Sequence, residues 1–223
     1  MRMSELSERS GVAIPSIKFY QREGLVSAGE HTSANQASYD DSHVARLALV
    51  RALIEVGGLS VSSASAVLAA IDNTAMPLDW AFGVAQRAAS KAFPAAEVVP
   101  SADAVGHVAE LAAKRGWAVE RSNPGVALAA RVIQTYRDMN HESLIATLPA
   151  YAEAADLIAA ADLAAVGALP DRASQTEAVV IGTVLGDTLL AGLRRIAQAS
   201  LSHALNLSAA PLDPIIDCKE EML

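Results

Sequence analysis

The stretch that decides the fold is "GVAIPSIKFYQREGLV", residues 11–26. Its centre has the pattern of a short helix, with Pro15 suited to the first turn because the fixed φ of proline fits that position. Gly24 is placed to end this helix. In the preceding segment, "SELSERSGV", Ser4 is a plausible N-cap and Gly11 follows the last turn of a first helix. Two helices joined by a tight, glycine-containing turn are typical of a helix-turn-helix.

The next segments extend this unit. Residues 27–41, "SAGEHTSANQASYDD", are rich in Ser, Asn and Gly, which predicts a hairpin or an extended loop. A third helix is expected to follow, with Asp41 or Ser42 as its N-cap and the glycine pair at 57–58 as its end. Ser60 is the expected N-cap of a fourth helix. The predicted order is helix, helix, wing, helix, helix.

Composition sets limits on the class of protein. The chain has 223 residues, 52% of them hydrophobic, and a formal net charge of −8, so any DNA-binding site must be local rather than a property of the whole surface. Its one cysteine, Cys218, can form no internal disulfide, in keeping with a reducing compartment. The N-terminus lacks the apolar run of a secretory signal, and the most apolar stretch, 178–186, is far shorter than a membrane span. We therefore expect a cytoplasmic protein without membrane contact.

The second part of the chain is alanine-rich and predicts a different organisation. Apolar periodicity and the positions of the prolines indicate helices at 78–92, 102–115, 124–139, 143–166 and 172–206, with no alternating strand. The expected fold is mainly α, with an N-terminal winged helix-turn-helix domain at 1–72 and an all-helical effector-binding and dimerisation domain at 73–223.

Residues 3–71 resemble the DNA-binding domain of the MerR family of transcriptional regulators. The matching segments are "MSELSERSGV", "SIKFYQREGLV", "SYDD" and "LALVRALIEVGGLSVSSASAVL". The resemblance implies that the helix "IPSIKFYQRE" enters the major groove and that the 27–39 segment is a wing that touches the DNA backbone. It also implies a homodimer on a near-palindromic operator of double-stranded DNA, where an effector bound in the C-terminal part lets RNA polymerase engage the promoter.

Hydroxyls and cations on the second helix can meet phosphates, the contacts that position a protein on a duplex. The candidate DNA-binding residues are Ser16, Lys18, Phe19, Tyr20, Arg22, His31 and Tyr39. Phe19 stands where the family often has tyrosine, and a packing role for it stays open. The wing carries Glu30-His31 and Asn35-Gln36-Ala37 where relatives have arginines and a Gly-Tyr-Arg. The alternative function is therefore a ligand-sequestering or protein-interaction module that has lost DNA binding.

The C-terminal part offers candidates for an effector site but none for catalysis. No nucleophile-and-base pattern, phosphate loop or zinc signature occurs, so an enzyme is not expected. Asp103, His107 and Glu110 share one helical face, but a surface charge cluster is the favoured interpretation and no metal or cofactor is predicted. Aromatic side chains between helices suit a small organic molecule, although plain core packing is the alternative. The candidates are Trp80, Trp117, Tyr136 and Tyr151.

The segment "TEAVVIGTVLGDTLLAGLRRIAQASL", residues 176–201, is apolar nearly all round through Leu193. A helix without a polar face is buried, either as a central core helix or in a subunit interface. In composition it is similar to the closing helices of TetR-type ligand domains. Because Pro77 and Pro94 confine the helix after residue 72 to a few turns, we expect residues 176–201 to contribute to the dimer interface.

Overall fold

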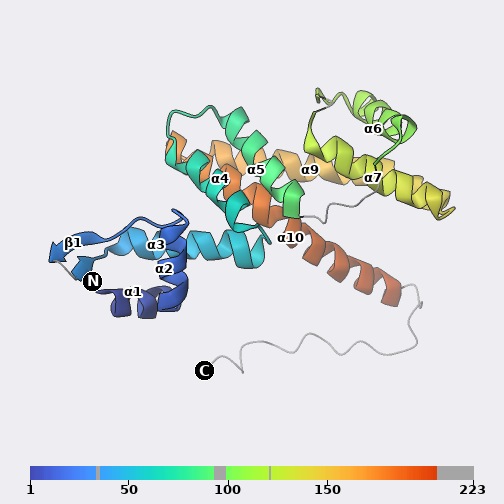
Figure 1. Ribbon diagram of the computed structural model, residues 1–223. Coiled ribbons are helices and arrows are strands. Elements are labelled where there is room, and N and C mark those ends of the chain that lie inside the picture. The colour runs from blue at the N-terminus through green and yellow to red at the C-terminus, as the bar shows by residue number, and fades with distance from the viewer. Residues whose placement is uncertain (34–35, 93–98, 121, 205–223) are drawn as a thin grey trace. The chain divides into compact units, whose positions relative to one another are not determined.

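The structure is a computed structural model that describes residues 1–33, 36–92, 99–120 and 122–204. Of the described residues, 1–185 form one compact unit and 186–204 belong to a second. The described part is mainly helical, as predicted (Figure 1). Cys218 and the last residues of the predicted helix at 172–206 lie outside the described residues.

The first five elements follow the predicted order of helix, helix, wing, helix, helix. The wing is a two-stranded antiparallel hairpin in which Glu30 lies opposite Ser38 and His31 opposite Ala37. The elements are α1 (Met3–Ser10), α2 (Ile14–Arg22), β1 (Glu30–Ser33), β2 (Gln36–Ser38), α3 (Asp41–Arg51) and α4 (Val61–Asp72).

Two of the predicted N-caps are wrong and one is confirmed. Helix α1 begins at Met3 with Arg2 as its N-cap, so Ser4 lies inside the helix. The cap of α3 is Asp40, one residue before the predicted pair, since its carboxylate Oδ1 accepts hydrogen bonds from the backbone N–H groups of Ser42 (3.0 Å) and His43 (3.3 Å). At α4 the Ser60 hydroxyl oxygen accepts from the backbone N–H of residue 63 at 3.1 Å, as expected.

Helix α3 continues into a short π-helical segment, η1 (Ala52–Val56), which ends at the predicted glycine pair. A π-helical turn holds one more residue per hydrogen-bonded ring than an α-helical turn and is frequently found at functional sites. Gly58 has φ +67°, a left-handed conformation that favours glycine.

The remaining helices agree with the predicted ranges except in one place. The predicted helix at 143–166 is broken into two, because Pro149 occupies the first turn of a new helix and cannot continue the previous one. Among the described residues after 72 there is no strand. The helices are α5 (Leu78–Ala92), α6 (Ala102–Arg115), α7 (Pro124–Asp138), α8 (Glu142–Ile145), α9 (Leu148–Gly167) and α10 (Arg172–Ala204).

The largest hydrophobic core joins the helix-turn-helix to later parts of the chain. Its fully buried side chains include Leu6 of α1, Ile17 of α2, Leu47 of α3 and Leu68 of α4. The same cluster takes in Ala85 and Ala88 of α5 and Val180 and Val184 of α10. The first compact unit therefore extends past the domain boundary that the sequence suggested near residue 72.

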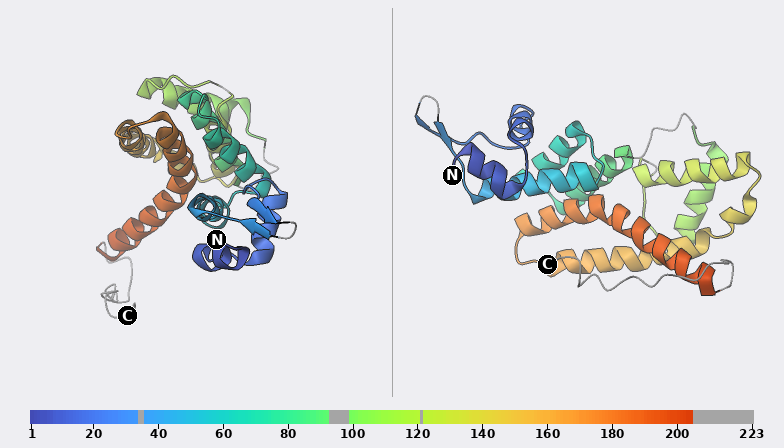
Figure 2. Two further views of the ribbon diagram at one scale, coloured as in Figure 1. Left: turned by 90° about the vertical axis from the view of Figure 1, so that its left-hand side faces the viewer. Right: turned by 90° about the horizontal axis from the view of Figure 1, so that it is seen from below.

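Two smaller clusters hold the other helices. Val166 of α9 and Val179 of α10 are buried with Ala81 of α5, and Figure 2 shows α9 and the first half of α10 side by side after the turn that joins them. Ala104, Ala130 and Ile133 form the contact between α6 and α7.

Half of the exposed large hydrophobic side chains in the described part of the chain lie on the two helices α9 and α10. By length and composition alone, segments 142–167 and 172–204 are long and apolar enough to cross a membrane. The uninterrupted apolar run at 178–186, on which the sequence prediction rests, is much shorter than either segment. Val179, Val180 and Val184 are at most 2% exposed, so the first half of α10 is a core helix.

Candidate nucleic-acid interface

Helix α2 is fixed on the core by Ile17, which is fully buried. Its N-cap, Ala13, provides no side-chain hydrogen bond, and Pro15 lies in its first turn. At the other end Gly24, with φ +73°, lets the chain reverse, and the backbone N–H of Leu25 donates to the carbonyl of Tyr20 at 2.9 Å. Pro15 and Gly24 thus define the two ends of the helix. The burial of Ile17 decides which face of the helix is exposed to solvent.

The free face of α2 presents two cations. Lys18 and Arg22 are both exposed and stand one helical turn apart, so they lie on the same side of the helix. Within the described part of the chain, no carboxylate lies within ion-pair distance of either side chain.

Three other arginines of the helix-turn-helix unit are in ion pairs, whereas Arg2, which precedes α1, is exposed. Arg9 contacts Asp41 at 2.7 Å, Arg46 contacts Asp72 at 2.7 Å and Arg51 contacts Glu55 at 3.0 Å. These pairs leave the positive charge of α2 as a local feature on a unit that is not basic overall. Lys and Arg side chains make the phosphate contacts that position a protein on a duplex.

The other candidates on α2 do not all share this face. Helical geometry places Phe19 beside Lys18 but turns Ser16 and Tyr20 to the opposite side. Tyr20 is partly buried and packs against the core, and its ring lies 5.7 Å from the ring of Phe19 at an angle of 54°. The structure therefore groups Lys18, Phe19 and Arg22 and separates Ser16 and Tyr20 from them.

Tyr39 has a different place from the one expected of a DNA contact. Its side chain is only 7% exposed, and its ring meets that of His43 edge-on at 5.2 Å. A Cβ atom on Gly29 would lie 2.8 Å from Tyr39 Cε1, so glycine is required there for close packing. Tyr39 is therefore a core residue at the base of the wing, and its predicted contact with DNA stays a prediction. The side chain of His31 lies outside the described part, while Glu30 is exposed.

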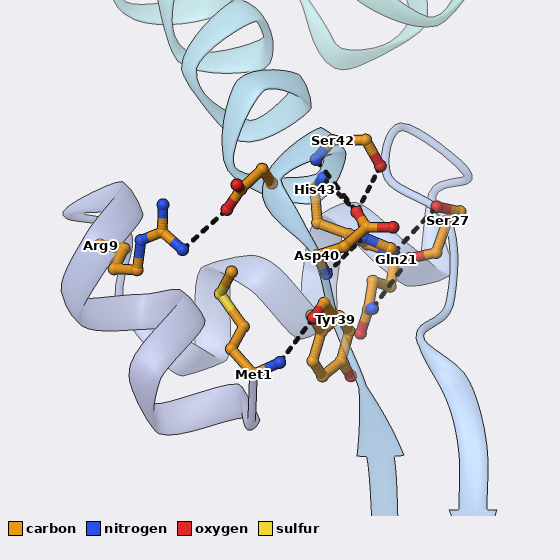
Figure 3. A network of polar contacts seen from close by, with 9 residues as sticks. Met1, Arg9, Gln21, Ser27, Tyr39, Asp40, Ser42 and His43 are labelled. Atoms are coloured by element: carbon orange, nitrogen blue, oxygen red, sulfur yellow. Dashed lines mark hydrogen bonds and ion pairs between the residues drawn. The ribbon is translucent and has the colours of Figure 1, made fainter.

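A network of polar contacts holds the two ends of the wing (Figure 3). His43 at the start of α3 reaches both: its Nε2 lies 3.2 Å from the hydroxyl of Ser27, before β1, and its Nδ1 lies 2.8 Å from Oδ1 of Asp40, after β2. Gln21 of α2 donates from Nε2 to the backbone carbonyl of Ser27 at 3.0 Å. These hydrogen bonds thus hold the wing and α2 in fixed positions relative to the start of α3.

The electrostatics of this network centre on Asp40. Hydrogen bonds from the Ser42 hydroxyl and from His43 hold the pKa of the Asp40 carboxyl well below its usual range. His43 was not among the residues predicted from the sequence. It lies three residues after the N-cap Asp40, which is the spacing of a capping box.

The four aromatic candidates for an effector site are not brought together. Trp80 is 66% exposed on α5 and Tyr151 is 50% exposed on α9, while Tyr136 is half-buried on α7. Trp117 follows α6, and its Nε1 donates to Oδ1 of Asp156 on α9 at 2.5 Å. The structure places each of the four on a different helix or loop, with much of their surface facing solvent, so it does not gather them around one pocket, and their role in effector binding stays a prediction.

Asp156 instead joins two helices. Besides the indole N–H, it accepts a hydrogen bond from Nε of Arg115 at 2.9 Å, and these contacts, Arg115 first, lower the pKa of the Asp156 carboxyl. Trp117 is therefore held at the contact between the end of α6 and the middle of α9.

A hollow of about 400 Å³ lies where α6, α7, α8 and the start of α9 meet. Arg137 on its wall donates from Nη1 to the Asp103 carboxylate at 2.8 Å. Asp103 is thus engaged, and in the described ranges no three His, Cys, Asp or Glu side chains gather as metal ligands. The sequence could not reveal this hollow, since it depends on the break between α8 and α9. Its lining residues are His107, Arg137, Glu142, Ile145, Ala146 and Pro149.

Comparisons with known proteins agree with the helix-turn-helix fold of the first part of the chain. Residues 1–71 match the family described as MerR HTH family regulatory protein. Nodulation protein NolA of Bradyrhizobium elkanii is 38% identical over 56 residues, which are 25% of this chain and 26% of that protein, so the match spans about a quarter of the curated relative. The crystal structure of SCO5550 from Streptomyces coelicolor A3(2), assigned as a transcriptional regulator, is 30% identical with a TM-score of 0.62. That match covers 91% of this chain and 96% of the other, so it includes the helical region as well.

Proposed function

The chain belongs to the MerR family of helix-turn-helix regulatory proteins, and we propose on that premise that it binds a near-palindromic operator as a homodimer under the control of a small organic effector. It is a DNA-binding transcriptional regulator rather than an enzyme, and it acts inside the cell, where its DNA is. RNA polymerase at the promoter is the further partner that this role requires. The proposed division of labour is DNA binding by residues 1–72 and effector binding and dimerisation by residues 73–223.

The observation that carries the DNA-binding part is the exposed pair Lys18 and Arg22 on the free face of α2. Cations one turn apart can each meet a phosphate while Phe19 lies beside them against the groove. Glu30 in the wing lowers the affinity for the DNA backbone, and α2 supplies the charge that the wing lacks. This arrangement favours DNA binding over the sequestering module that the cation-poor wing had suggested.

Selection from a random duplex pool tests this function. The full-length protein is expected to enrich a near-palindromic sequence, since two copies related by a two-fold axis read two half-sites. Recovery of no enriched sequence would overturn the proposal and favour the sequestering module.

Support for a homodimer comes from the second half of α10, residues 186–204. Leu189, Leu193 and Ile196 follow one another at spacings of four and three residues, the pattern of a coiled-coil seam. They are 64%, 54% and 61% exposed, which is costly for side chains of this size in a solitary chain. A second copy of the same helix is the partner we propose for this stripe.

The hollow beside α8 is the place we propose for the effector, instead of the four aromatic residues. Its volume of about 400 Å³ falls within the usual range for small-molecule sites. Ile145, Ala146 and Pro149 give it an apolar wall. Arg137, which also donates to Asp103, and His107 offer nitrogen donors, and Glu142 adds one carboxylate. This combination suits a small organic molecule with one anionic group, such as a carboxylate.

A thermal-shift screen with a panel of small organic acids tests the proposed site. Some compounds are expected to raise the thermal unfolding midpoint of the wild-type protein. The same compounds should raise the midpoint of the Arg137→Gln variant much less. Lys114→Gln, an exposed cation on α6, is the control and should behave as wild type. Equal shifts for wild type and Arg137→Gln would place the effector elsewhere.

A further inference from the structure

Gly57 is required to be a glycine by its close neighbours and not by its backbone conformation. Its φ of −76° and ψ of −10° are ordinary right-handed values that any residue adopts. A Cβ atom at this position would overlap Cγ1 of Val184 and would lie 2.8 Å from the carbonyl oxygen of Leu53. The absence of a side chain at Gly57 therefore lets α10 lie directly against the end of η1.

The same part of α10 is held in two cores at once. Val180 and Val184 are buried in the main core with the helix-turn-helix. Val179, the neighbour of Val180, is buried on an adjacent face with Ala81 of α5 and Val166 of α9. All three valines are at most 2% exposed. Packed interiors resist small displacements, so α10 cannot move against one core without disturbing the other.

Helix α3 and η1 connect this contact to the wing. Their continuous helical segment begins at Asp40 and His43, which hold the two ends of the wing, and it ends at Gly57, against which Val184 packs. Leu53 of η1 is fully buried, so this segment is packed in the main core up to its end at Gly57. A shift of α10 at Gly57 therefore displaces the continuous helix of α3 and η1, and the other end of this helix holds the base of the wing.

We propose that the packing contact between Val184 and Gly57 couples the position of the helical region to the DNA-binding unit. The inference rests on the proposed function, since it states how the position of α10 regulates the wing and α2. Coupling between two sites is reciprocal, so operator binding must in turn change the stability of α10 where it meets Gly57.

Hydrogen exchange on the full-length protein, with and without the selected operator, measures this reciprocity. In the wild-type protein, amides of residues 176–185 are expected to exchange about fivefold more slowly when the operator is bound. Amides of α7, which does not contact Gly57, report the general stabilisation by a ligand, and the α10 effect must exceed theirs. Gly57→Ala is expected to bind the operator but to lose this excess protection.

Two further variants keep the test decisive. Gly186→Ala, whose added Cβ meets nothing within 4 Å, is the matched control and should retain the excess protection. Val184→Ala removes the methyl groups that a side chain at 57 would strike, so combining it with Gly57→Ala should restore part of the coupling. Should Gly57→Ala fail to fold, Val184→Ala alone is expected to reduce the excess protection.

The outcomes separate the two proposals. An operator that binds while α10 and α7 change equally would overturn the proposed coupling and leave DNA recognition intact. If no operator is found, the proposed function fails and the proposed coupling fails with it. Unchanged excess protection in a folded Gly57→Ala variant would also overturn the inference.

Discussion

The guanidinium of Arg46 makes two parallel hydrogen bonds to the carboxylate of Asp72, from Nη1 to Oδ1 at 2.8 Å and from Nη2 to Oδ2 at 2.7 Å. Its Nε donates to the backbone carbonyl of Leu25 at 2.8 Å. One side chain of α3 thus joins the end of α4 to the segment that enters the wing.

Arg46→Lys is expected to lower the free energy of unfolding by about 1 kcal/mol, because lysine cannot replace both the paired bonds and the bond to Leu25. Urea denaturation measures the change. Arg51→Lys is the control, since the Arg51 pair with Glu55 joins residues only one turn apart and its loss should matter less. Equal effects of the two variants would show that the link between helices adds nothing.

Lys18→Ala tests the contact of α2 with DNA. If Lys18 meets one phosphate in each subunit of a dimer, its removal should lower the slope of log K against log salt by about two units, at about 0.9 for each phosphate. Fluorescence anisotropy with the selected operator over a range of salt concentrations gives the slope. Lys114→Ala removes an equally exposed cation far along the chain and should not change it. A folded Lys18→Ala variant with the wild-type slope would exclude the contact.

Glu30→Arg tests the wing from the opposite direction. Glu30 is exposed at the start of β1 and repels the DNA backbone if the wing approaches it. The variant should bind more tightly at low salt and have a steeper salt dependence, because a repulsive charge becomes a phosphate contact. Glu120→Arg, which makes the same change of charge outside the helix-turn-helix, controls for net charge. If both variants gain equally, the wing does not approach DNA.

Asp40→Asn is expected to change how stability depends on pH. The Ser42 hydroxyl and His43 lower the pKa of Asp40 in the folded chain, so its contribution is present above the unfolded pKa of about 3.9 and is lost as the pH falls below it. The wild-type protein should therefore lose more stability than the variant between about pH 4 and pH 2, while asparagine keeps the N-cap. Urea midpoints across this range measure the difference, and parallel curves would contradict it.

Leu193→Glu tests the proposed dimer contact on the second half of α10. A charge in the middle of the stripe of Leu189, Leu193 and Ile196 should convert the dimer to a monomer at micromolar concentration and weaken operator binding. Light scattering gives the mass. Val132→Glu, at a 43% exposed apolar position of α7, is the control and should remain dimeric. A dimer of unchanged stability in Leu193→Glu would place the interface elsewhere.

The sequence determined the helices and their order, because the signals that start and stop a helix act over a few residues. Ser60 caps α4 through its own hydroxyl, and Gly11 ends α1 with φ +65°. Pro149 shows the limit of this reasoning, since it divides a helix that apolar periodicity alone would continue. The exposed pair on α2 could be predicted in the same way. Once Ile17 is assigned to the core, helical spacing places Lys18 and Arg22 on the free face.

Only the tertiary structure decided which side chains meet across long distances along the chain. Tyr39 and Lys18 are both polar residues in a predicted DNA-binding unit, yet Tyr39 is buried beneath the wing because Gly29 leaves room for its ring. The aromatic residues of the second part lie apart, whereas Arg137 and Ile145 come together beside a hollow that no local pattern marks. Gly57 has the pattern of one more helix end until Val184, 127 residues later, is seen to pack against it. Local backbone preferences are encoded in neighbouring residues, but these contacts arise from the packing of whole helices, which no short stretch of sequence specifies.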